Sequence, residues 1–178
     1  MVEEIFDVVN EHDEVIGQKP RSEIHRLKLS HRAVHVLVFN SRGELFLQKR
    51  SMKKDCFPGL WDSSASGHLA SGESYDECSV RELREEIGLQ PARPPERLFK
   101  VDARPETGQE FVWVYRCAAE GPFKLESEEI ESGGWFALVA LSRWVAEKPG
   151  EFANGFVWIW NEMLQRGLVT LQAAGREY

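Results

Sequence analysis

Alternating hydrophobic and polar positions predict strands in the first half of the chain. Residues 5–9 and 14–17 flank a turn rich in Asn and Asp, which predicts a β-hairpin. Residues 33–39 and 44–48, on either side of a turn that ends in glycine, predict a second hairpin with stronger strand character. Further short strands are expected at residues 61–66, 97–101, 111–115 and 134–137.

A helical pattern replaces this alternation after residue 74. Ser74 and Glu77 form a capping-box pattern, and Gly88 is a favourable stop, so the sequence predicts a helix of about four turns between them. The apolar positions of this helix recur at helical spacing and form one stripe that faces the core: Val80, Leu83 and Ile87.

Two later segments, residues 141–147 and 152–165, also have helical spacing. The second is rich in Trp and Phe; such a helix more often packs in a core, although it could also wall a ligand pocket. No repeat or long breaker run divides the chain. We therefore expect one domain over residues 1–178, with residues 1–30 as an N-terminal hairpin extension, and an α/β (α+β) fold around a mixed sheet.

The composition of the chain excludes some classes of partner. The 178 residues are 42% hydrophobic, which is sufficient for a core, and the net charge of -7 argues against a nucleic-acid partner. No apolar run approaches the roughly 20 residues that span a bilayer, and the first residues lack a basic secretion signal, so we expect no membrane contact and a cytoplasmic protein. The cysteines are odd in number and far apart, and reduced thiols are expected: Cys56, Cys78 and Cys117.

Three glutamates of the predicted helix, Glu82, Glu85 and Glu86, lie at i, i+3 and i+4 on a face separate from the apolar stripe. Like charges at this spacing repel, so the patch is either a solvated face compensated by neighbouring arginines or a place for a cation. The glycine-containing loop at residues 67–72 comes just before the helix and favours the cation. Hard oxygen ligands suit Mg²⁺ or Mn²⁺, ions that proteins commonly share with substrate phosphates.

These residues resemble the signature of the Nudix family, G-x5-E-x7-R-E-U-x-E-E-x-G-U with U aliphatic. Every fixed position is met, by Gly67, Glu73, Arg81, Glu82, Leu83, Glu85, Glu86, Gly88 and Leu89. The resemblance implies a Nudix-type α/β/α sandwich around a mixed sheet, with the box (residues 67–89) at a metal site. It also implies hydrolysis of a diphosphate linkage in a nucleotide or related small molecule.

The resemblance assigns roles within the box. Glu82, Glu85 and Glu86 are implied to hold Mg²⁺, or Mn²⁺, together with the carbonyl of Gly67, and one of the glutamates is a candidate base. Arg81 joins this catalytic group as the partner of Glu73, in an ion pair that orients the helix. The metal is implied to neutralise phosphate charge and to activate the attacking water.

Outside the box, the chain resembles type I isopentenyl-diphosphate isomerases and the hydrolases that share their architecture, over roughly residues 5–165. Those isomerases hold a metal with imidazoles at three positions, where this chain has His25, His31 and His68. Glu110 matches one of two glutamates that complete that site, and Gly108 stands at the other. A possible second metal site is one reading. The other is that His25 and His31 lie in a surface turn, where a histidine is more often unliganded.

The same resemblance implies contacts with diphosphate at three basic positions, for which ordinary surface charge is the alternative. They are Arg21, Arg50 and Lys54. Three acids near the last predicted strand match a stretch where some family members place an extra base or ligand, with simple solvation as the alternative. They are Glu128, Glu129 and Glu131.

Isomerase chemistry is the alternative function. The isomerases use a cysteine next to the glycine that opens the box, and Ser66 stands there in this chain. They also lack the acids that this chain has at Glu82 and Glu85, and both departures favour hydrolysis. We therefore expect a Nudix hydrolase acting on a small-molecule diphosphate, as a monomer or a homodimer, with an isopentenyl-diphosphate delta-isomerase-like enzyme as the alternative.

Overall fold

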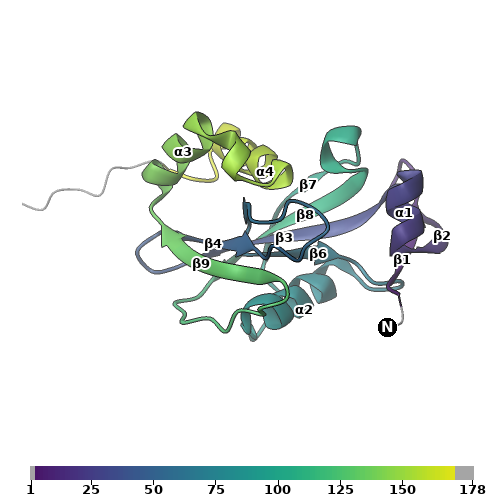
Figure 1. The fold of residues 1–178 in the computed structure, drawn as a ribbon, viewed down its shortest axis with the longest axis horizontal. Coiled ribbons are helices and arrows are strands. Elements are labelled where there is room, and N and C mark those ends of the chain that lie inside the picture. Colours follow the sequence, from purple (N-terminus) through teal and green to yellow (C-terminus); the bar gives the residue numbers. More distant parts are fainter. Residues whose placement is uncertain (1–2, 171–178) are drawn as a thin grey trace, which may run out of the picture.

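The centre of the computed structural model, which describes residues 3–170, is a mixed sheet of seven strands. Helix α2 covers one face of this sheet, and α3 and α4 cover the other (Figure 1). The strands of the sheet are β3 (His31–Phe39), β4 (Leu45–Arg50), β5 (Trp61–Asp62), β6 (Ala65–His68), β7 (Glu96–Val101), β8 (Glu110–Ala118) and β9 (Ile130–Phe136). The larger helices are α2 (Tyr75–Ile87), α3 (Leu138–Glu147) and α4 (Asn154–Gln165). The expected α/β/α sandwich is confirmed.

Strand β3 organises the sheet. It runs parallel to β8 along its whole length, from the His31 and Glu110 pair to the Phe39 and Ala118 pair. On its other side, the first half of β3 pairs with β6 and its last two residues pair with β4. Because β6 opens the box, β3 connects the box directly to the start of β8.

The two faces of β3 enter different cores, as expected for side chains that alternate along a strand. On the face toward α3 and α4, the apolar side chains pack with residues of both helices, such as Leu141 and Phe156. On the opposite face they pack with α2 through Leu83 and Ile87. Each layer of the sandwich therefore has its own apolar core.

The box helix begins and ends as predicted. The Ser74 hydroxyl accepts a hydrogen bond from the Glu77 amide at 3.3 Å, and the Glu77 carboxylate accepts one from the Ser74 amide at 2.9 Å. Gly88 ends α2 in the left-handed region, with φ of 68°, which glycine adopts without strain.

The N-terminal residues form the expected hairpin, β1 (Ile5–Val9) and β2 (Val15–Pro20), as a separate two-stranded sheet at one end of the molecule (Figure 1). The surface turn expected around His25 and His31 is wrong, because residues Arg21–Leu27 form helix α1 and His31 begins β3. This helix has only 7 residues, no side-chain N-cap and one buried residue, Ile24. Its sequence therefore shows little helical periodicity. His31 is not at the surface either, since it is 1% exposed at the start of β3.

Smaller differences concern element boundaries. The extended segment expected at residues 61–66 is two strands, because β5 pairs with β4 and β6 pairs with β3. Gly67 is consequently part of a strand rather than a loop. Helix α3 begins three residues before the predicted start. Within residues 3–170, no helix has both the length and the apolar character needed to cross a membrane.

Leu83 is fully buried between α2 and the sheet, so Leu83→Ala should leave a cavity. We expect the free energy of unfolding to fall by about 2–5 kcal/mol. Urea denaturation measures this. Val139→Ala, at an exposed position of α3, is the control and should change stability by less than about 0.5 kcal/mol. Equal effects of the two variants would contradict this account of the core.

Candidate active site

A cleft of about 920 Å³ opens beside the box. Its wall combines α2, β6, α1, the loop over residues 50–57, the loop over residues 105–110 and the first turn of α4. Most of the site residues expected from the sequence line this cleft. The exceptions are His31, whose ring lies beside those of His25 and His68, and the two acids Glu73 and Glu131.

The three box glutamates have different environments. Glu86 is 5% exposed, and its carboxylate accepts hydrogen bonds from Gln48 Nε2 and from the Ser66 amide, both at 2.9 Å. Glu82 is 8% exposed, whereas the Glu85 side chain is about half exposed. Burial raises the pKa of Glu82 to about 7. Burial, followed by the charge of Glu82, raises the pKa of Glu86 well above its usual range.

Gly67 lies directly against Glu82. A Cβ atom at position 67 would be 1.9 Å from Glu82 Oε1, so only glycine leaves room for this carboxylate. The backbone of β6 and the acidic face of α2 are therefore in contact at this point, because residue 67 has no side chain.

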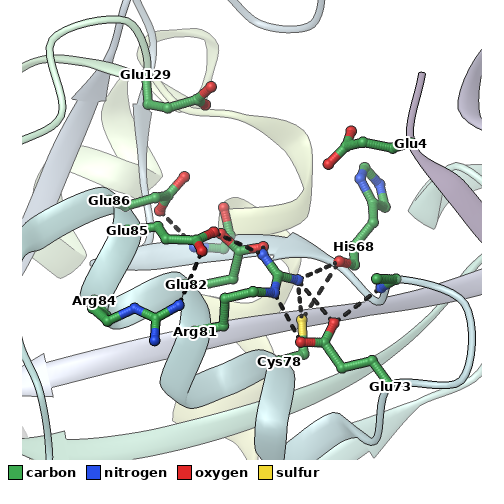
Figure 2. A network of polar contacts seen from close by, with 12 residues as sticks. Glu4, His68, Glu73, Cys78, Arg81, Glu82, Arg84, Glu85, Glu86 and Glu129 are labelled. Carbon is green, nitrogen blue, oxygen red and sulfur yellow. Dashed lines mark hydrogen bonds and ion pairs between the residues drawn. The ribbon is translucent and has the colours of Figure 1, made fainter. Parts of the chain in front are cut away.

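Arg81 is the centre of the polar network in Figure 2. Its Nε and Nη2 atoms donate to the two carboxylate oxygens of Glu73 at 2.8 and 2.9 Å. Nη2 also donates to the His68 carbonyl at 2.9 Å, and Nη1 donates to Glu82 at 2.7 Å and to Glu85 at 3.1 Å. The predicted pair of Arg81 and Glu73 is present, and the same guanidinium also contacts two of the three box acids.

The three basic residues expected to meet phosphate all line the cleft, and each contacts a carboxylate. Arg21 Nη1 lies 3.0 Å from Asp55, and Arg50 Nη1 lies 3.1 Å from Asp62. Lys54 pairs with Glu129. Of the three acids expected near the last strand, Glu128 and Glu129 line the cleft. Glu131 lies on β9 and pairs with Lys49.

The histidines come together although they are far apart in the sequence. One ring nitrogen from each of His25, His31 and His68 lies within 4.8 Å of the others. Glu110 joins them, with Oε1 at 2.9 Å from His68 Nε2 and 3.6 Å from His31 Nε2. Burial alone would raise the pKa of Glu110, but its contacts with His31 and His68 hold that pKa well below its usual range.

His31 has a buried ring nitrogen without a hydrogen-bond partner in this cluster. Its Nδ1 atom lies 2.9 Å from the carbonyl of Leu29, which can only accept, so Nδ1 carries the proton. The other ring nitrogen, Nε2, is buried without a hydrogen-bond partner among the described residues. It lies 3.6 Å from Glu110 Oε1. Burial lowers the pKa of His25 to about 4, so this ring is neutral near pH 7.

Some residues of the cleft did not stand out in the sequence. Gln48 is buried on a strand and orients Glu86 through a hydrogen bond. In the sequence it is only a polar residue at the end of an expected strand. His35 lines the cleft on the core-facing side of β3, where alternation favours an apolar residue. Trp158 lines the cleft, whereas Phe156 and Trp160 are in the core, so the aromatic helix serves both of the expected purposes.

The structure thus has a mixed sheet between helices, with a carboxylate-rich helix facing a cleft. Residues 29–155 match the model of the NUDIX domain, and the chain belongs to the Nudix family. It is a Nudix pyrophosphohydrolase. The hairpin and α1 come before the matched residues.

Relatives and solved structures agree with this assignment. An uncharacterized Nudix hydrolase of Pseudomonas aeruginosa is 37% identical over 131 residues, covering 71% of this chain and 75% of the relative. One of Clostridium acetobutylicum is 32% identical over 170 residues, covering 88% of this chain and 82% of the relative. The crystal structure of DR0079 from Deinococcus radiodurans is similar with a TM-score of 0.76 and 32% identity, covering 92% of this chain and 98% of that chain. The narrower resemblance to isopentenyl-diphosphate isomerases stays a prediction.

Gly67→Ala should displace the Glu82 carboxylate, because the added methyl group occupies its place. We expect kcat/KM for hydrolysis to fall by about 100-fold, the scale of a 1 Å misplacement in an active site. Gly17→Ala is the control, since nothing lies within 4 Å of its Cβ position. Retention of full activity in Gly67→Ala would show that Glu82 does not need this position.

Proposed function

We propose that this enzyme uses Mg²⁺, with Mn²⁺ as a substitute, to hydrolyse a diphosphate linkage in a nucleotide or related small molecule. The observation that carries the proposal is the position of Glu82 and Glu86, two buried carboxylates of one helix face, at the wall of a cleft that also has a basic rim. In this proposal residues 1–178 act as one domain, since residues on both sides of the family segment, such as Arg21 of α1 and Trp158 of α4, line the same cleft.

The residues at the box fit a divalent cation. Burial opposes the charged forms of Glu82 and Glu86 and raises the pKa of both. A bound cation would offset the cost of burying these two negative charges. The donor set, three carboxylates and a backbone carbonyl, is the hard oxygen type that Mg²⁺ and Mn²⁺ prefer. Glu82, Glu85, Glu86 and the Gly67 carbonyl would hold it.

When bound, Mg²⁺ supplies charge neutralisation for the phosphates and lowers the pKa of a water. The protein supplies the remaining functions. Arg81 fixes the orientation of the acidic face through Glu73. Arg21, Arg50 and Lys54 are placed to bind and orient the substrate diphosphate. A glutamate of the box takes the proton of the attacking water.

Glu82→Gln tests this proposal, because it removes a charge and keeps the shape of the side chain. We expect loss of at least about 100-fold in kcat, measured with Mg²⁺ as formation of the phosphorus-containing products of each substrate, resolved by phosphorus NMR. The substrate panel contains nucleoside diphosphates and triphosphates, dinucleotides, nucleotide sugars, coenzyme A and isopentenyl diphosphate. Full activity in Glu82→Gln would refute the proposal.

Glu96→Gln is the matched control, since Glu96 is an exposed acid at the start of β7, and it should leave the rate unchanged. Chelation of metal by EDTA should abolish turnover, and Mg²⁺ should restore it. Proton exchange into isopentenyl diphosphate without phosphate release would instead support the isomerase alternative.

We also propose a second metal site at His25, His31, His68 and Glu110. The buried Nε2 atom of His31 favours it, because this atom has no hydrogen-bond partner among the described residues and lies 3.6 Å from Glu110 Oε1, so that a cation would bind both atoms. Imidazole and carboxylate ligands suit Zn²⁺ and Mn²⁺. Here Gly108, at the position of the missing glutamate, offers no carboxylate.

His25→Ala tests the second site with little risk to the fold, since His25 is the least buried of the three histidines. We expect the whole protein to lose one bound equivalent of Mn²⁺ in equilibrium dialysis, while Glu82→Gln removes a different equivalent. His12→Ala, at an exposed histidine of the hairpin turn, should bind as the wild type does. An unchanged stoichiometry in His25→Ala would rule out the second site.

A further inference from the structure

The N-terminal hairpin lies outside the residues matched by the family model, yet it contacts the box. The contact involves the loop between β6 and α2, which carries Ser71 and Gly72. The Ser71 amide donates to the Ile5 carbonyl of β1 at 2.9 Å. Gln18 of β2 donates to the Ser71 hydroxyl. Both strands of the hairpin therefore hold the same short stretch of the box.

Asp7 of β1 makes the largest number of these contacts. Its Oδ1 atom accepts from the Ser71 hydroxyl at 2.8 Å and from Gln18 Nε2 at 3.3 Å, and its Oδ2 atom accepts from the Gly72 amide at 2.9 Å. The residue is 6% exposed. A buried carboxylate is costly unless hydrogen bonds satisfy it, and here three donors converge on it from the box loop and β2.

The loop that Asp7 holds leads directly to the acidic face of α2. Gly72, in the left-handed region with φ of +79°, forms the turn before Glu73. The Glu73 carboxylate accepts from the Ala70 amide at 2.9 Å and receives Arg81 with both oxygens. Arg81 in turn contacts Glu82 and Glu85. Asp7 is thus connected to the acidic patch by its hydrogen bond to the Gly72 amide, the peptide bond from Gly72 to Glu73, and the hydrogen bonds of Arg81.

Attachment of the hairpin to the rest of the molecule does not depend on Asp7. Phe6 and Val8, its neighbours in β1, pack with Ile24 in a small apolar core. At the hairpin turn, Asp13 accepts from Arg32 at 2.6 Å and from the Tyr75 hydroxyl at 2.9 Å. Because these contacts already fix the hairpin in place, the charge of Asp7 requires another explanation.

We infer that Asp7 is a positioning residue for the metal-binding glutamates, acting through Gly72, Glu73 and Arg81. This inference rests on the proposed function of the box. It also gives the hairpin a role in the reaction: β1 fixes the turn that presents Glu73, and Glu73 fixes the guanidinium that orients Glu82 and Glu85. Loss of the Asp7 carboxylate releases this turn while every proposed metal ligand stays in the chain.

The test compares Asp7→Ala with the control Asn10→Ala in the full chain. Asn10 belongs to the same hairpin, where its Oδ1 atom accepts from the His12 and Glu14 amides at 2.9 and 3.0 Å, away from the box loop. Mn²⁺ titration followed by electron paramagnetic resonance measures affinity at the site that Glu82→Gln removes. Melting temperatures of both variants report the loss of stability.

We expect Asp7→Ala to weaken Mn²⁺ binding at this site by about tenfold, the lower end of the effect of removing an outer partner of a metal ligand. Asn10→Ala should lower the melting temperature and leave the affinity unchanged. Asp7→Asn should lie in between, because an amide has one acceptor oxygen for donors that now use two. The Asp7→Asn variant also serves as the test if Asp7→Ala does not fold.

Wild-type affinity in Asp7→Ala or Asp7→Asn would overturn the inference, and so would an equal loss of affinity in Asn10→Ala. Failure of the proposed function gives a different result, because the Glu82→Gln variant would then bind as much Mn²⁺ as the wild-type protein does. In that case the inference fails together with the function on which it rests.

Discussion

The site depends on the electrostatic cost of burying negative charges close together. Glu82 and Glu86 lie within one helical turn of each other, largely out of water, and both resist ionisation. The contacts around them reduce this cost: Arg81 donates to Glu82, while Gln48 and the Ser66 amide donate to Glu86. These donors come from three different elements, so the acidic patch can exist only when the sheet and the helix are both in place.

Strand β3 explains why two groups of candidate ligands lie in one cleft. In the antiparallel pair of β3 and β6, Val34 lies opposite Gly67 and Ala33 opposite His68. In the parallel pair of β3 and β8, His31 lies opposite Glu110. Residues far apart in the chain thus become neighbours through the register of one central strand. The box and the histidine cluster share the strand β6, because Gly67 belongs to the box and His68 belongs to the histidine cluster.

The sequence was sufficient for the sandwich, the capped helix and the pair of Arg81 and Glu73, since each depends on local spacing or on a contiguous signature. It did not predict α1, whose seven residues bury only Ile24 and show no clear periodicity. It also did not place His31 in the interior, because burial there follows from pairing with β8 rather than from neighbours in sequence. The role of Gln48 depends on a contact 38 residues away, for which the chain carries no local pattern.

The ion pairs at the rim of the cleft bear on how an anion enters it. Arg21, Arg50 and Lys54 already have carboxylate partners, in Asp55, Asp62 and Glu129. Under the proposed function, an incoming phosphate would compete with a tethered carboxylate for each of these cations. Such competition favours ligands of high charge density over weakly charged ones. After cleavage, each product would carry less charge than the substrate, and the tethered carboxylate would take its place at each cation. The original ion pairs would then re-form as the product leaves.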